Sequence, residues 1–191
     1  MGIFKAVVKH IVQKDETRVL KRRLEALSKV DVFVGIPAGE MHENSTLTDA
    51  QLLYIQEHGV RKKSMRDEMQ PQLDAGVPYS KAYQLYLHEH GSPLWQIPPR
   101  PVLEPAIASV KGKIAKQFEK AHIAAIEGKD FMPFLNAAGK IGRDAAYNWF
   151  TDPRNNWPAN APGTIQQKGS DRPLIDTGEM RRAITWVVEK K

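Results

Sequence analysis

Apolar residues recur at steps of three and four positions over two stretches in the second half of the chain, a spacing that places them on one face of an α-helix. Gly128 separates the stretches and is placed to end the first helix, and the second starts near Asp130. Because the connection is short, the pattern predicts an antiparallel helical hairpin over residues 103–149. The stripe positions are Leu103, Ile107, Val110, Ile114, Phe118, Ala121 and Ala125, then Phe134, Ala138, Ile141, Ala145 and Trp149.

The second helix of this hairpin also carries an unusual number of small residues. Without bulky side chains, another element can approach its backbone closely. These residues are Ala137, Ala138, Gly139, Gly142, Ala145 and Ala146.

Two short runs of β-branched and aromatic residues, Val32–Ile36 and Ile184–Val188, predict strands. Residues Asp15–Lys29 predict an amphipathic helix with Leu20, Leu24 and Leu27 on one face, whereas Ile3–Val12 is compatible with a strand or a helix. Together these elements predict an α+β fold, in which a small, mainly antiparallel sheet packs against two or three helices and carries a long inserted loop or arm. A length of 191 residues fits one domain spanning the whole chain.

A nearly identical string occurs twice, as LLYIQEHGV at Leu52–Val60 and as QLYLHEHGS at Gln84–Ser92. Nothing else recurs at this spacing, so the strings predict two similar short helices rather than a solenoid. Thr48 or Asp49 can cap the first helix, and Gly59 is placed to end it. Between the strings, residues 61–82 are polar and contain proline and glycine, and we expect an inserted excursion in the form of an exposed arm or long loop.

Towards the end of the chain, residues 151–173 are rich in proline, asparagine, glycine and serine and predict a second long loop. Asp176 and Glu179 then have the spacing of a capping box, which predicts that a short helix starts at Thr177.

The charge balance adds a possible polyanionic partner. The net charge is +6, and basic residues concentrate near the start of the chain and just after residue 60. We interpret them mainly as a solvated helix face and a polar loop, with nonspecific contact to DNA phosphates as the alternative. The possible DNA-facing residues are Arg18, Lys21, Arg22, Arg23, Arg61, Lys62 and Lys63.

Composition excludes several classes of site. Cysteine is absent, so disulfides, thiol nucleophiles and thiolate metal sites are excluded. No apolar run approaches the roughly 18 residues that span a bilayer, and Met1–Val12 lacks the features of a signal peptide. We therefore expect no membrane partner and synthesis in the cytoplasm.

Two motifs with possible catalytic chemistry have simpler structural interpretations. On a helix, His88 and His90 point about 200° apart and cannot chelate one ion. Asp176-Thr177-Gly178 matches the Asp-Thr-Gly of aspartic proteases, but the flanking pattern is missing and helix capping explains the same residues. No phosphate-binding glycine loop occurs. We expect no enzyme activity, no cofactor and no metal.

Two blocks, IPPRPVLEPAI at Ile97–Ile107 and APGTIQQKGSDRPLIDTGEMRRAITWVV at Ala161–Val188, closely resemble the tail-component family of long-tailed bacteriophages, which includes tail-completion, neck and virion-morphogenesis proteins. The family's motifs match in order at Val34–Pro37, Glu89–Gly91, Ile97–Leu103 and Pro173–Thr185. The duplicated Glu-His-Gly string and the 61–82 excursion depart from its shortest members. The matched positions expected to serve structure or interfaces are Ile97, Pro98, Pro99, Arg100, Pro101, Leu174, Asp176, Thr177 and Gly178.

This resemblance implies a structural virion protein that completes the tail and joins it to the head at the neck. It implies an oligomeric ring of this chain, in contact with neighbouring connector, tail-terminator or tail-tube proteins, and a location in the neck or tail of the virion. A basic ring lumen could also face packaged DNA nonspecifically. The alternative function is a basic nucleic-acid-binding module.

Overall fold

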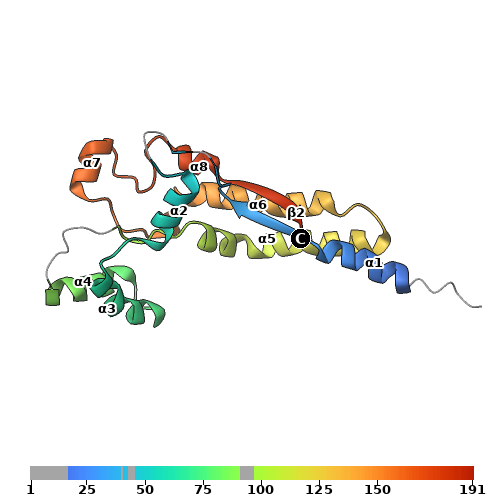
Figure 1. Ribbon diagram of the computed structural model, residues 1–191, viewed down its shortest axis with the longest axis horizontal. Coiled ribbons are helices and arrows are strands. Elements are labelled where there is room, and N and C mark those ends of the chain that lie inside the picture. Colours follow the sequence, from blue (N-terminus) through green and yellow to red (C-terminus); the bar gives the residue numbers. More distant parts are fainter. Residues whose placement is uncertain (1–16, 40, 43–45, 91–96) are drawn as a thin grey trace, which may run out of the picture.

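A computed structural model describes residues 17–39, 41–42, 46–90 and 97–191. The protein has the predicted α+β fold: helices predominate and one two-stranded antiparallel sheet packs on them. The body is elongated, with helix α1 at one end and the pair α3 and α4 at the other (Figure 1). The predictions for Ile3–Val12 and for Gly91 lie outside the described residues.

The predicted helical hairpin is confirmed as α5 (Leu103–Glu127) and α6 (Met132–Trp149). Gly128 ends α5 in the left-handed conformation, with its N–H directed at the carbonyls of Ala124 and Ala125. Asp130 then accepts a hydrogen bond from the backbone of Met132 at 2.9 Å, at the start of α6. The two helices form the long axis of the molecule (Figure 1).

Strands β1 (Val30–Gly35) and β2 (Thr185–Lys190) pair antiparallel, from Val30 opposite Lys190 to Gly35 opposite Thr185. The sheet packs on α6 over its predicted small residues. A Cβ on Gly139 would lie 2.3 Å from Trp186 Cδ1, and a Cβ on Gly142 would lie 2.9 Å from Val34 Cγ2. The close approach therefore requires glycine at both positions.

The opposite face of the sheet is open. Phe33 and Val187 are partners in the strand register and point away from α6, with 55% and 38% of their surfaces exposed. A two-stranded sheet has little stability by itself, so packing on α6 holds this ribbon in place.

Helix α1 (Thr17–Ser28) lies within the predicted 15–29 helix and packs on α5. Of its predicted apolar face, Leu27 is buried with Ala121 and Ala125, but Leu20 and Leu24 remain exposed. The predicted amphipathic helix is therefore present, but only the end of its apolar face is covered, by α5.

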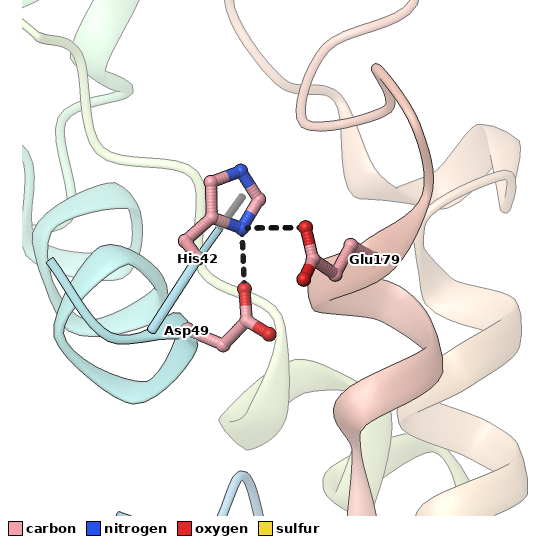
Figure 2. A group of neighbouring side chains, drawn as sticks. All are labelled: His42, Asp49 and Glu179. Atoms are coloured by element: carbon pink, nitrogen blue, oxygen red, sulfur yellow. Dashed lines mark hydrogen bonds and ion pairs between the residues drawn. The ribbon is translucent and has the colours of Figure 1, made fainter. Parts of the chain in front are cut away.

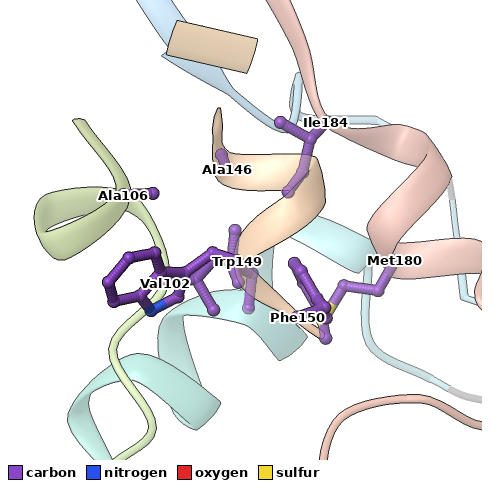
Figure 3. Close-up of a cluster of buried hydrophobic side chains, with 8 residues drawn as sticks. Val102, Ala106, Ala146, Trp149, Phe150, Met180 and Ile184 are labelled. Carbon is purple, nitrogen blue, oxygen red and sulfur yellow. The ribbon is translucent and has the colours of Figure 1, made fainter. Parts of the chain in front are cut away.

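Helix α2 (Asp49–His58) is capped by Thr48, whose side chain accepts a hydrogen bond from the Gln51 backbone N–H. The Gln51 side chain in turn accepts one from the Thr48 backbone N–H. The helix contributes Leu53 to the main core, which joins α2, α5, α6, α8 and the adjoining chain. Figure 3 shows this cluster, and its buried members are Leu53, Val102, Ala106, Ala146, Trp149, Phe150, Met180 and Ile184.

Residues 61–82 were predicted to form an exposed arm or long loop. They instead form most of a second helical hairpin. Helices α3 (Lys63–Asp74) and α4 (Tyr79–His90) pack together over a small core of their own. Met65 and Met69 are fully buried there against Ala82 and Tyr86. Methionines four positions apart, on an otherwise polar helix, provide the apolar face that the prediction missed.

The predicted loop at 151–173 is only partly irregular, because it contains the 3₁₀ turn η1 (Pro153–Asn155) and the helix α7 (Pro162–Lys168). Helix α8 (Glu179–Ala183) begins two residues later than predicted. The predicted Asp176 cap is wrong: Gly178 occupies the N-cap position in the left-handed conformation, without a side-chain cap. Thr177 Oγ1 instead accepts from the Glu179 backbone at 3.3 Å.

Candidate functional site

The first Glu-His-Gly string fastens the end of α2 to the start of α5. Val102 occupies the N-cap position of α5 and has no side-chain oxygen to satisfy the free N–H groups there. Glu57 supplies the missing acceptor: its Oε1 accepts hydrogen bonds from the backbone N–H groups of Leu103 at 2.7 Å and of Val102 at 3.2 Å. A carboxylate at this position is also favoured by the positive end of the helix dipole.

Gly59 lets the proline-rich segment 97–101 lie directly on the end of α2. Val60 and Ile97 exchange two backbone hydrogen bonds of 2.8 Å, and Arg100 donates its backbone N–H to Gln56. Gly59 has a φ of +67°, and a Cβ there would lie 2.6 Å from Ile97 O and 2.7 Å from Pro99 N. No other residue fits without moving the segment.

Arg100 fastens the same segment to the 151–173 region. The residue is 6% exposed, and its guanidinium donates to the carbonyls of Pro158 at 3.0 Å and Ala159 at 3.1 Å. Burial lowers the pKa of this guanidinium, an effect that Tyr79 opposes. The indole of Trp157 also donates to the carbonyl of Pro101 at 3.0 Å. The proline-rich block thus serves internal packing over much of its length.

A cavity of about 930 Å³ opens where α2, α4, the proline-rich segment, α7 and the turn before α8 meet. Tyr79 of α4 is half-buried on its wall, and burial raises the pKa of its hydroxyl to about 12 against the opposing effects of Arg61 and Arg100. Lys168 of α7 also lines the cavity, and burial lowers its pKa, opposed by Asp176.

The second family block forms another wall of this cavity. Leu174, Asp176, Thr177 and Gly178 all line it, and Leu174 adopts a positive φ of 59°. The guanidinium of Arg182 donates to the carbonyl of Thr177 at 2.9 Å, which closes the turn. The two blocks that carry the resemblance are therefore brought together around one cavity.

Three titratable side chains lie close together at the edge of the same cavity, which His42 and Glu179 line (Figure 2). His42 Nδ1 lies 2.6 Å from Asp49 Oδ1 and 3.4 Å from Glu179 Oε2. Asp49, the first residue of α2, is 3% exposed, and Glu179 is the first residue of α8. Imidazole and carboxylate are the ligand types that divalent transition metals use. Sequence reasoning did not group them, because no local spacing links residues 42, 49 and 179.

The Glu89-His90 pair of the second string lies on the far side of α4 and contacts α3. His90 Nε2 lies 2.7 Å from Glu68 and 3.8 Å from Glu89, and these three residues form a second histidine–carboxylate cluster. His88 is not part of the cluster, as expected from the helical geometry of residues two positions apart.

The predicted basic residues do not form one surface. Arg18, Lys21 and Arg22 are exposed on α1, whereas Lys62 and Lys63 are exposed beside α3 at the opposite end of the molecule (Figure 1). Two of the set serve internal contacts: Arg23 donates to the carbonyl of Ile126 at 3.0 Å, and Arg61 donates to Gln70 at 2.8 Å.

Comparison of the chain with known protein families, with curated proteins and with solved structures finds no match. In the described part of the chain, no helix is both long enough and apolar enough to cross a membrane.

Proposed function

We propose that this protein is a structural component of a tailed-bacteriophage virion, which completes the tail at the neck as a subunit of an oligomeric ring. One observation carries the proposal: the two sequence blocks that resemble the tail-component family pack around one cavity. Arg100 of the first block holds the chain just before the second, while Asp176–Gly178 of the second line the cavity beside Arg100. Motifs of this kind hold a framework together rather than present reactive groups.

A subunit of a ring also needs surface that neighbouring copies can cover. Apolar side chains are exposed at several places among the described residues, including Phe33 with Val187 on the open face of the sheet and Ile123 with Ile126 near the end of α5. The strands also leave their outer backbone edges unpaired within the described residues, and such edges readily accept another strand. We assign the open sheet face to contact with a second copy of this chain.

The decisive experiment is a nonsense mutation in the gene for this protein in the phage that carries it. We expect separate heads and tails by electron microscopy, and recovery of joined, infectious particles when the intact protein is supplied from a plasmid. The purified virions should contain the chain by mass spectrometry. Joined, infectious particles without the protein, or virions that lack it, would overturn the proposal.

Variants can then locate the contact. Phe33→Asp places a charge on the open sheet face, and Lys111→Asp places one on an exposed position of α5 as a matched control. We expect the first variant to fold, by circular dichroism, and to fail in complementation, while the second complements. Equal complementation by both would remove the sheet face from the interface.

The separated basic groups on α1 and beside α3 do not favour the alternative of a nucleic-acid-binding module with one binding face. Salt-dependent binding of DNA to the isolated protein would restore that alternative.

A further inference from the structure

His42, Asp49 and Glu179 have an arrangement that a simple ion pair does not explain. One imidazole nitrogen, His42 Nδ1, faces an oxygen of Asp49 and an oxygen of Glu179. A ring nitrogen carries at most one hydrogen, so it can donate one good hydrogen bond and not two. The three ligand atoms all lie within 4.8 Å of one another, near enough for a single ion at one common point to contact all three.

The charges at this point also favour a cation. Asp49 is almost fully buried, and in the described part of the chain its carboxylate is paired with His42 alone. The Glu179 carboxylate approaches the same imidazole nitrogen from α8, at 3.4 Å. Burial of a carboxylate is costly unless opposite charge compensates it. A divalent ion at the common point would compensate both carboxylates at once.

We propose that His42, Asp49 and Glu179 form a binding site for a divalent transition-metal ion of the zinc class. The 3.4 Å between His42 Nδ1 and Glu179 Oε2 matches an edge of roughly 3.3–3.5 Å in a tetrahedron with metal–ligand bonds of about 2.0–2.2 Å. The shorter 2.6 Å contact between His42 Nδ1 and Asp49 Oδ1 is a hydrogen bond, and it would have to lengthen when an ion takes the place of its proton. Imidazole in the ligand set favours zinc over the hard ions magnesium and calcium.

The ion would join two parts of the chain that are far apart in the sequence, residues 42–49 and the start of α8. His42 precedes α2, Asp49 begins α2, and Glu179 begins α8 directly after the Asp176–Gly178 turn. All ligand residues except Asp49 line the cavity, so the fourth position faces open space that water can fill. The site would thus tie the start of α2 to the second family block. This inference is independent of the proposed role in the virion.

The test uses the full-length protein, stripped with a chelator and titrated at pH 7.5 with zinc chloride, with magnesium chloride as comparison. We expect one zinc ion per chain by elemental analysis, a rise in Tm with zinc and none with magnesium. Glu179→Gln and His42→Gln each remove a ligand, and we expect zinc affinity to fall at least tenfold by calorimetry. The matched control is His90→Gln, which removes the imidazole of the Glu68–Glu89–His90 cluster and should leave the affinity unchanged.

Circular dichroism establishes whether each variant is folded. Glu179 is partly exposed at the start of a short helix, so Glu179→Gln decides the question if His42→Gln does not fold. Three outcomes would overturn the proposal: no zinc binding to the original protein, equal binding by Glu179→Gln, or loss of binding in His90→Gln. A Tm that changes with pH but not with zinc or chelator would also overturn the proposal, and would show that the three groups form only an ion pair.

Discussion

Helices α2 and α4 end in nearly the same residues, Leu-Tyr-Ile-Gln-Glu-His and Leu-Tyr-Leu-His-Glu-His, yet they bury different faces, about 100° apart around the helix. In α2, Leu53 is 4% exposed and Tyr54 is 64% exposed. In α4 the corresponding values are reversed, with Leu85 47% exposed and Tyr86 7% exposed. The same local sequence therefore enters two different cores by different sides.

The two helix ends share a contact between side chains of the same helix. In both helices the tyrosine ring contacts the histidine ring four positions later: Tyr54 and His58 are stacked with centroids 4.1 Å apart, and Tyr86 and His90 are tilted with centroids 4.7 Å apart. Residues at this spacing lie above one another on any helix. What differs is tertiary: Glu57 caps α5, whereas Glu89 is exposed and lies 3.8 Å from His90. The shared sequence thus determines the contacts within each helix, whereas the surrounding elements determine which face of the helix is buried.

The largest effect on the free energy of unfolding should come from truncating the buried leucine of the pair Leu53 and Leu85. Leu53→Ala removes a side chain from the main core, and we expect the free energy of unfolding to fall by about 2–4 kcal/mol. Leu85→Ala removes an exposed side chain and should change it by no more than about 0.5 kcal/mol. Urea unfolding followed by circular dichroism measures both. Equal losses would contradict the different burial of Leu53 and Leu85.

The next effect concerns the glycine that follows the first string. Gly59→Ala should cost about 2–4 kcal/mol, because it adds a clash with Ile97 and Pro99 to the strain of a positive φ. Gly76, between α3 and α4, has a φ of +83° and no atom within 4 Å of an added Cβ. Gly76→Ala therefore isolates the strain and should cost about 1–2 kcal/mol. If both variants lose the same amount, the close crossing of the proline-rich segment does not contribute.

A smaller effect distinguishes the two glutamates. Glu57→Ala leaves the first N–H groups of α5 without their acceptor, and we expect a loss of about 1–2 kcal/mol. Glu89→Ala should lie within about 0.5 kcal/mol of the original protein. Hydrogen exchange at Leu103 gives a second readout, since its amide should lose protection only in Glu57→Ala. Protection that survives the loss of Glu57 would show that another group caps α5.

The smallest effect is a pH dependence confined to the α3–α4 hairpin. The pKa of Tyr79 is about 12, above its ordinary value of 10.0, because burial disfavours the charged form. The unfolded chain therefore releases this proton first, and the stabilising contribution that is complete below pH 10 is lost as the pH rises towards 12. Tyr79→Phe should make stability less steep between these values. Partial solvent screening keeps the difference below about 1 kcal/mol. If the dependence of stability on pH is the same in Tyr79→Phe, the Tyr79 hydroxyl is exposed to solvent and its pKa is not raised by burial.

The parts of the fold that were predictable are those with a strong local signal. The α5–α6 hairpin followed from its apolar spacing and Gly128, and the glycines of α6 correctly indicated a close contact. The α3 helix was missed because its apolar face consists of Met65, Met69 and Leu73 in a polar stretch, with Pro71 inside the helix. A four-residue spacing was present, but proline and glycine nearby favoured a loop.

The candidate site was less predictable, for a physical reason. Asp176 has the spacing of a helix cap, but the left-handed Gly178 starts α8 without it. The proximity of His42, Asp49 and Glu179 depends on how α2 packs against α8 in three dimensions. No periodicity within the chain records such a contact, whereas the capping of α2 by Thr48 is local and was anticipated.

The pairing of β1 with β2 has a consequence for how the molecule is made. About 150 residues separate the two strands, so the ribosome releases β1 long before its partner exists. Until β2 arrives, the glycine-lined groove of α6 is only half covered, and the backbone edge of β1 has no native partner. Closure of the ribbon thus requires a long-range contact of the kind that forms slowly, and during synthesis it leaves the edge of β1 open to pairing with other chains.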